Sequence, residues 1–142
     1  MGPSLARICA CVFAFCAIAV LPQCAAEHGG KPVMKPLLVL IFDKNCKAWC
    51  SQVRPVVADL QKSYIDDVEF AEIDVTPGVL PEAKKKAKEL GIGNLLEDTI
   101  GQVPLVLICA SARSKDYNEI VGPKSKEIYE DYLKKVLSKR AK

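Results

Sequence analysis

Short apolar runs alternate with amphipathic stretches along most of the chain, and this alternation predicts the elements of the fold. Residues 37–42 (LLVLIF) form a continuous apolar run that ends at Asp43, a pattern typical of a strand buried on both faces. Three further segments read as strands: 68–75, 103–109 and 118–121. Apolar residues at helical spacing predict helices elsewhere: 51–64, 81–90, a short one around 95–99, and 125–137.

The order of these elements predicts an α/β fold. The first strand–helix–strand unit favours parallel strands with helices on both faces of the sheet, and the last two strands are expected to be antiparallel. Pro55 is expected to kink the first helix. In the last helix we expect five side chains to face inward: Ile128, Tyr132, Leu133, Val136 and Leu137.

The first 26 residues are typical of an export signal. Arg7 is their only charge, residues 8–21 carry no charged side chain, and small residues suit cleavage near Ala26. The apolar run is shorter than the roughly 20 residues that span a bilayer, although an uncleaved anchor is an alternative. We therefore expect export to a periplasm, an organelle lumen or the extracellular space. Membrane contact is expected only if the N-terminal segment is retained or lipidated.

Composition narrows the classes of function. A length of 142 residues fits one domain, with residues 27–36 as a linker and residues 37–142 as the folded domain with a basic tail. A net charge of +3 without one basic face argues against nucleic acid as a partner. His28 is the only histidine, which argues against a multi-histidine metal site or a Ser-His-Asp triad. We expect no cofactor.

Three of the seven cysteines would remain after signal cleavage. Cys109 lies late in an apolar strand and is expected to be a buried, inert thiol. Cys46 and Cys50 lie between the first strand and the first helix. A helix N-terminus favours a thiolate, which is the species that attacks disulfides. The pair therefore predicts a redox-active dithiol, with a structural disulfide or two buried thiols as the alternatives.

Five features resemble the thioredoxin family, in the same order and across about residues 37–137. They are a strand ending at Phe42, a proline five residues past Cys50 (Pro55), the strand FAEIDV at 70–75, Pro104 in QVPL, and Val121-Gly122 before the last helix. The resemblance implies a thioredoxin-like fold, with a central mixed sheet of about four to five strands flanked by helices on both faces. It also implies thiol–disulfide exchange with protein thiols and disulfides, an oxidoreductase activity.

The resemblance assigns roles to individual residues. Cys46 would attack and Cys50 would resolve the mixed disulfide. Val103 and Pro104, with a cis bond between them, would bind the substrate backbone, and Trp49 would offer an apolar wall. The family motif has two residues between its cysteines, whereas here there are three. A second alignment therefore reverses the roles of the two cysteines.

The buried aspartate that lies behind the family's active site is absent from its usual position in this chain. Ile41 occupies the position of the family's buried aspartate, and Glu72 falls where many relatives place its charged partner. We hypothesise that Glu72 handles protons, with its pKa raised by burial. The alternative is an ordinary strand glutamate that reaches solvent, and Asp43 on the loop is a second candidate.

Two other classes of function stay open. A Cys-x-x-x-Cys pair on this fold is similar to that of Sco-type copper chaperones, in which Cys46 and Cys50 would bind Cu(I). That family follows its second cysteine with proline, where this chain has Ser51. The third class is a redox-silent interaction domain that keeps the fold and a structural disulfide.

Overall fold

A computed structural model describes residues 34–140, which belong to one compact unit, Pro32–Lys142. The expected signal segment and most of the expected linker lie outside the described residues. Pro36, expected in the linker, is instead buried, and its carbonyl accepts a hydrogen bond from the Glu69 N–H (2.8 Å). Within residues 34–140, no helix has both the length and the apolar character needed to cross a membrane.

The centre of the unit is a four-stranded mixed sheet. Its strands are β1 (Leu37–Phe42), β2 (Glu69–Asp74), β3 (Leu105–Cys109) and β4 (Tyr117–Val121). They lie in the order β2-β1-β3-β4, with β1 and β2 parallel and the other two pairs antiparallel. Both expected strand directions are therefore confirmed.

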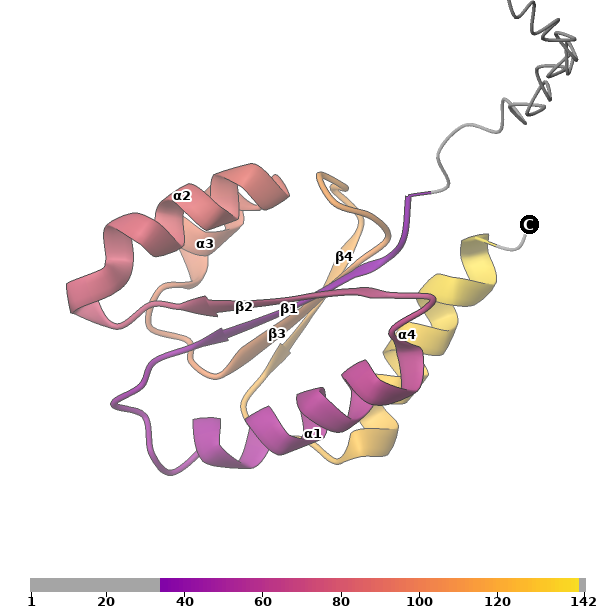
Figure 1. Cartoon of the computed structure of the whole chain (residues 1–142), viewed down its shortest axis with the longest axis horizontal. Helices are drawn as coiled ribbons and strands as arrows, with labels where there is room; N and C mark the ends of the chain where they lie inside the picture. The colour runs from indigo at the N-terminus through magenta and orange to yellow at the C-terminus, as the bar shows by residue number, and fades with distance from the viewer. Residues whose placement is uncertain (1–33, 141–142) are drawn as a thin grey trace, which may run out of the picture. The chain divides into compact units, whose positions relative to one another are not determined.

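Helices cover both faces of the sheet. They are α1 (Cys50–Tyr64), α2 (Leu80–Leu90), α3 (Gly93–Thr99) and α4 (Lys126–Arg140), and a short 3-10 helix (Pro77–Val79) precedes α2. Figure 1 shows α1 and α4 on one face and α2 and α3 on the other. Pro55 lies within α1, which continues past it to Tyr64.

The apolar run of β1 is explained by the two layers of helices. All six of its side chains are buried, and they alternate between two clusters. Leu40 packs on the α1 and α4 side, whereas Ile41 packs on the α2 and α3 side. Because both faces are covered, the strand needs apolar residues at every position. Burying one such side chain is worth roughly 1.5–3 kcal/mol relative to leaving it exposed.

The inward face of α4 differs from the expected one. Ile128 is exposed, while Tyr129 is completely buried and Leu133 lies one turn further along the same face. The Tyr129 hydroxyl donates a hydrogen bond to the Gly122 carbonyl (3.2 Å) and accepts one from the Lys124 N–H (3.3 Å). These bonds allow a phenol to replace an aliphatic side chain in the core, where burial raises its pKa.

The sheet brings four connecting segments to one edge. The carboxyl ends of the parallel strands β1 and β2 lie there, as do the start of β3 and the end of β4. The peptide bond between Val103 and Pro104 is cis, as expected. The Pro104 carbonyl accepts a hydrogen bond from the Gly122 N–H (2.9 Å), which joins two of these segments. Strand order, strand direction and the two helical layers together confirm the thioredoxin-like fold.

Candidate active site

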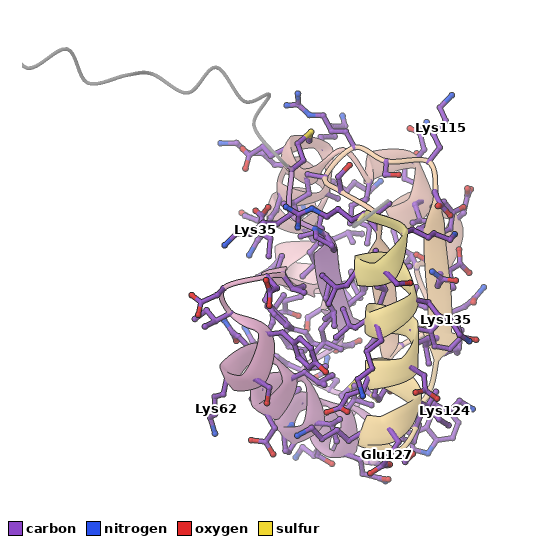
Figure 2. The ribbon with its side chains drawn as sticks, turned by 90° about the vertical axis from the view of Figure 1, so that its right-hand side faces the viewer. Lys35, Lys62, Lys115, Lys124, Glu127 and Lys135 are labelled. Carbon is purple, nitrogen blue, oxygen red and sulfur yellow. The ribbon has the colours of Figure 1, made fainter. Side chains whose placement is uncertain are left out.

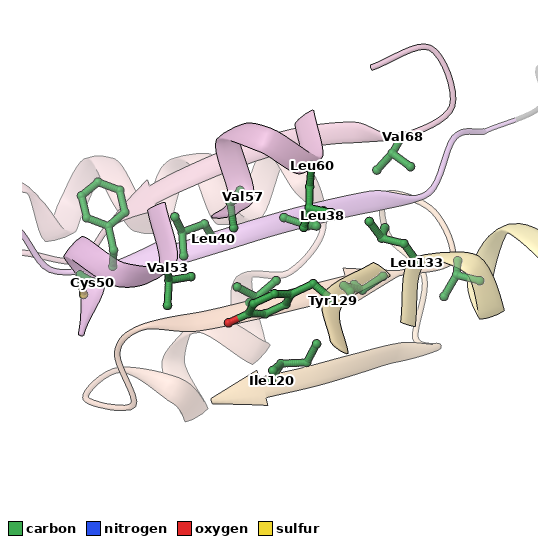
Figure 3. Packing of buried hydrophobic residues seen from close by; sticks show 14 residues of the cluster. Leu38, Leu40, Cys50, Val53, Val57, Leu60, Val68, Ile120, Tyr129 and Leu133 are labelled. Atoms are coloured by element: carbon green, nitrogen blue, oxygen red, sulfur yellow. The ribbon is translucent and has the colours of Figure 1, made fainter. Parts of the chain in front are cut away.

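Cys46 and Cys50 lie on the segment that leaves the sheet after β1. Cys46 is half-buried in a turn closed by a hydrogen bond from its N–H to the Asp43 carbonyl (3.0 Å). Cys50 is the first residue of α1 and is almost completely buried. Figure 3 shows Cys50 at the end of the core cluster that continues through Val53 along α1. Both side chains are thiols in this structure.

The two thiols differ in acidity because one of them donates to the other. Hydrogen bonds from the Cys50 thiol and from the Cys50 backbone N–H lower the pKa of Cys46, and the Trp49 N–H adds to this effect. Burial and the charge of Asp43 oppose it without reversing it. Burial and, to a smaller extent, the bond to the Cys46 sulfur together raise the pKa of Cys50 to about 11. The sulfur of Cys46 is therefore the one that favours the thiolate.

The start of α1 acts on these two sulfurs in opposite ways. The sequence suggested that the helix N-terminus would favour a thiolate in a cysteine placed there. In the structure, the backbone N–H groups of Trp49 and Cys50 at the start of α1 lower the pKa of Cys46, while Cys50 is itself part of the helix and is covered by the core. The extra residue in the motif thus leaves Cys46 outside the helix but within reach of its N–H groups.

A hollow of about 200 Å³ opens beside the dithiol. Three cationic side chains line it, and Lys47 forms no ion pair with any residue of the described range. The complete lining consists of Phe42, Asp43, Lys44, Cys46, Lys47, Cys50, Ser51 and Arg54. The positive charge favours anionic species at the sulfurs, including the thiolate that exchange chemistry needs.

A polar network fixes the loop that carries Cys46. The Lys44 side chain forms an ion pair with Asp74 at the end of β2 (2.7 Å), and the Lys44 N–H donates to the Thr76 hydroxyl (3.0 Å). The Asp43 carboxylate accepts a hydrogen bond from the Asn45 N–H (2.8 Å). The Thr76 hydroxyl, which has a single proton, lies within hydrogen-bond distance of both the Asp43 carboxylate (3.1 Å) and the Asp74 carboxylate. The segments after the two parallel strands are thereby joined directly behind the dithiol.

Sequence reasoning missed this network. Its signal is present as polar residues directly after each of two parallel strands, Asp43 and Lys44 after β1 and Asp74 and Thr76 around the end of β2. Because the carboxyl ends of parallel strands meet at one edge, this pattern predicts contact between the two groups.

Glu72 does not occupy the buried position that the sequence suggested. Its side chain is 46% exposed and pairs with Arg54 at 3.1 Å, so the expectation of burial is wrong. The Arg54 guanidinium also lies over the Phe42 ring, 4.5 Å from its centre. Arg54 lines the hollow beside the dithiol, whereas Glu72 does not. The carboxylate reaches solvent because β2 is an edge strand of the sheet.

The expected substrate-binding residues lie at the same edge of the sheet. Val103 is half-buried and packs against the cluster that also contacts Cys46, and Pro104 is buried. Trp49, directly before α1, is 56% exposed. Val121 is also exposed and directly precedes Gly122, which is bonded to Pro104. Exposed apolar side chains therefore lie at the same end of the sheet as the dithiol, and sequence analysis did not propose Val121 among them.

Cys109 is not part of this site. It is completely buried, as expected, and lies opposite Leu37 at the other end of the sheet. Burial raises its pKa to about 11.

The chemistry of a metal centre finds little support beyond the dithiol itself. Within residues 34–140, no group of three or more His, Cys, Asp or Glu side chains is placed to hold a metal ion. Two thiolates alone can bind Cu(I), so the copper alternative stays an untested expectation. His28 lies outside the described residues.

Comparisons with known proteins find similarity at the level of solved structures. No protein-family model matches the chain, and no curated protein matches it. Among solved structures, thioredoxin O2 from Arabidopsis thaliana in its oxidised state is similar to this chain. The two share 20% sequence identity over 72% of this chain and 75% of that one, with a TM-score of 0.48. The strand order and the cis peptide bond described above, rather than this likeness, carry the fold assignment.

Proposed function

We propose that the protein is a thiol–disulfide oxidoreductase that exchanges disulfides with protein substrates through Cys46 and Cys50. The observation that carries this proposal is the opposite acidity of two hydrogen-bonded thiols, one lowered and one raised, at a loop-to-helix junction. Perturbed pKa values of this kind cluster at functional sites.

The asymmetry assigns a role to each sulfur. The Cys46 thiolate attacks one sulfur of a substrate disulfide, forming a mixed disulfide and releasing the other substrate sulfur as a thiolate, which takes up a proton. Cys50 then loses its proton and attacks the Cys46 sulfur. The Cys46–Cys50 disulfide forms, the second substrate thiol leaves, and two electrons have passed to the substrate. The reverse sequence oxidises a dithiol substrate.

Cys50 needs a proton acceptor for the second step, because its pKa is about 11. Asp43 lines the same hollow, and its charge acts on both sulfurs. We therefore assign the proton transfer to Asp43 in place of the exposed Glu72. A carboxylate that receives a proton from a thiol and passes it to water performs general base catalysis.

Reduction of insulin disulfides by the purified protein, driven by dithiothreitol, tests this function. We expect turnover above the uncatalysed rate, loss of turnover in Cys46→Ser, and normal turnover in Cys109→Ala, which removes a thiol remote from the site. Equal rates for Cys46→Ser and the unchanged protein would exclude the proposed chemistry and leave the redox-silent interaction domain as the better account.

We further propose that the protein works after export. Support comes from the sequence of residues 1–26, and from the fact that disulfide exchange suits compartments in which disulfides persist. N-terminal sequencing of the protein recovered from its native compartment should begin near Glu27. A chain that begins at Met1 in the cytosol would contradict the proposal.

A further inference from the structure

A second and larger hollow lies at the opposite end of the sheet from the cysteines. Its volume is about 570 Å³, within the range of small-molecule sites. It is formed by the C-terminal end of α2, the start of α3 and the loop between β3 and β4. Figure 1 shows the end of α2 beside that loop, and Figure 2 shows Lys115 at the end of the folded unit opposite Lys124, which follows β4.

Three cationic side chains line this hollow without a carboxylate partner. They are Lys88, Arg113 and Lys115, and none of them forms an ion pair with another residue in the range 34–140. Asp98 is the only acidic residue of the lining. The lining thus carries a net charge of +2.

The backbone holds Arg113 in a strained conformation at the rim. Its φ is +65°, which is uncommon for any residue other than glycine, and its N–H donates to the Leu90 carbonyl (3.1 Å). Gly91, also with positive φ, lets the two segments approach, since a Cβ there would lie 2.7 Å from the Arg113 Cα. Strain of this kind clusters at ligand-binding positions.

The remaining side chains of the lining are suited to contact a ring of a bound ligand. Tyr117 is 40% exposed, Leu95 is half-buried, and Asp98 provides an acceptor for a hydroxyl or amino group. We propose that this hollow binds a small phosphate monoester that carries a ring, of the nucleoside monophosphate class. A phosphate monoester has a charge near −2 at pH 7, which matches the lining. Arg113 and Lys88 contact the phosphate, and Tyr117 contacts the ring.

Titration of the purified protein with AMP, followed by the amide signals of residues 91–95 and 113–117 in heteronuclear NMR spectra, tests the site. We expect a saturable shift of these signals, with adenosine binding at least about tenfold more weakly because it lacks the charge-assisted hydrogen bonds. Absence of a saturable shift at millimolar AMP would overturn the proposal, and so would equal binding of adenosine.

Matched variants separate a site from general attraction of anions to a basic surface. Lys88→Gln and Lys85→Gln remove the same charge from the same helix, but Lys85 does not line the hollow. We expect Lys88→Gln to weaken AMP binding about tenfold and Lys85→Gln to change it less than twofold. Arg113→Asn, which tolerates positive φ, should weaken binding like Lys88→Gln. Equal losses in Lys85→Gln and Lys88→Gln would show that no built site exists.

Discussion

At the scale of single residues, the proposed exchange of disulfides depends on the different surroundings of two identical side chains, Cys46 and Cys50. Cys46 lies outside the helix and accepts hydrogen bonds, whereas Cys50 lies inside it and is covered by the core. Sequence analysis left the roles of the two cysteines open, because spacing alone does not say which sulfur is covered. Burial and hydrogen bonding favour Cys46 as the nucleophile.

The first prediction concerns the pH dependence of alkylation. Only the thiolate reacts with iodoacetamide at an appreciable rate, so Cys46 should be alkylated at a lower pH than an ordinary thiol. Cys50 should stay protected until the pH approaches about 11. Peptide mass spectrometry of the reduced protein at a series of pH values measures both rates. Faster alkylation of Cys50 than of Cys46 at pH 7 would reverse the assigned roles.

The second prediction concerns the carboxylate that accepts the proton of Cys50. Asp43→Asn should slow the release of reduced substrate by about tenfold to a hundredfold and flatten the pH dependence of that step, as expected for loss of a general base. Glu72→Gln is the matched control, because it neutralises a carboxylate on the exposed side of β2. The assignment fails if Glu72→Gln alters the pH profile and Asp43→Asn does not.

At the scale of elements, ties between loops position the edge of the sheet that carries the dithiol. The network of Asp43, Lys44, Asp74 and Thr76 joins the ends of β1 and β2. Tyr129 on α4 holds Gly122, which in turn is bonded to Pro104. Neither tie is visible in an analysis of single elements, since each joins residues that only the folded topology brings together. The expected inward face of α4 missed Tyr129 for a related reason, because a phenol in the core depends on partners on another segment.

The third prediction concerns the acid stability that the loop network provides. Partial burial alone would raise the pKa of Asp74, but the ion pair with Lys44 and the hydrogen bonds from Thr76 outweigh it and lower the pKa to about 2. A carboxylate whose pKa is lower in the folded state stabilises the protein above pH about 4. That contribution is lost as the pH falls from about 4 to about 2.

Urea unfolding at several pH values measures this contribution. Asp74→Asn should lower the free energy of unfolding at pH 7 by about 1 kcal/mol, less than the full pKa shift implies because Lys44 is largely exposed. The difference from the unchanged protein should shrink as the pH falls through about 2 and vanish below it. Asp59→Asn, which breaks an exposed pair on α1, should change stability by less than about 0.5 kcal/mol. Equal effects of the two variants at pH 7 would contradict the role of the network.

The fourth prediction concerns the tie made by Tyr129. Tyr129→Phe keeps the ring in the core but removes both hydrogen bonds of the hydroxyl, leaving the Gly122 carbonyl without this donor. We expect a loss of about 1 kcal/mol in the free energy of unfolding. Tyr132→Phe on the same helix removes a hydroxyl from a half-buried ring that lies beside Lys135, and it should change stability by less than about 0.5 kcal/mol. An unchanged free energy of unfolding in Tyr129→Phe would show that the hydroxyl does not hold the loop.

At the scale of the whole molecule, the two central strands could be predicted because their apolar runs match their complete burial. Residues 37–42 are apolar at every position since helices cover both faces of β1, and the cis proline followed from the resemblance in QVPL. The position of Glu72 could not be predicted, because exposure depends on β2 being an edge strand. The hollow lined by Lys88 and Arg113 could not be predicted either, because it is formed by segments that are far apart in the sequence. In the sequence, Lys88 looks like part of an ordinary charged helix face.

The two proposed sites lie at opposite ends of the sheet. The dithiol lies where β1 and β2 end, and the cationic hollow lies at the opposite edge. Variants of one end should therefore leave the other intact: Lys88→Gln should retain insulin reduction. The two proposals thus stand or fall independently.

The most direct test of the central claim is the reduction potential of the Cys46–Cys50 couple. The purified protein is equilibrated in glutathione buffers, and the thiol and disulfide forms are counted by mass spectrometry. We expect a reversible couple between about −120 and −270 mV, the span of proteins that exchange disulfides. A disulfide that resists reduction below about −300 mV, or a pair that never forms one, would contradict it.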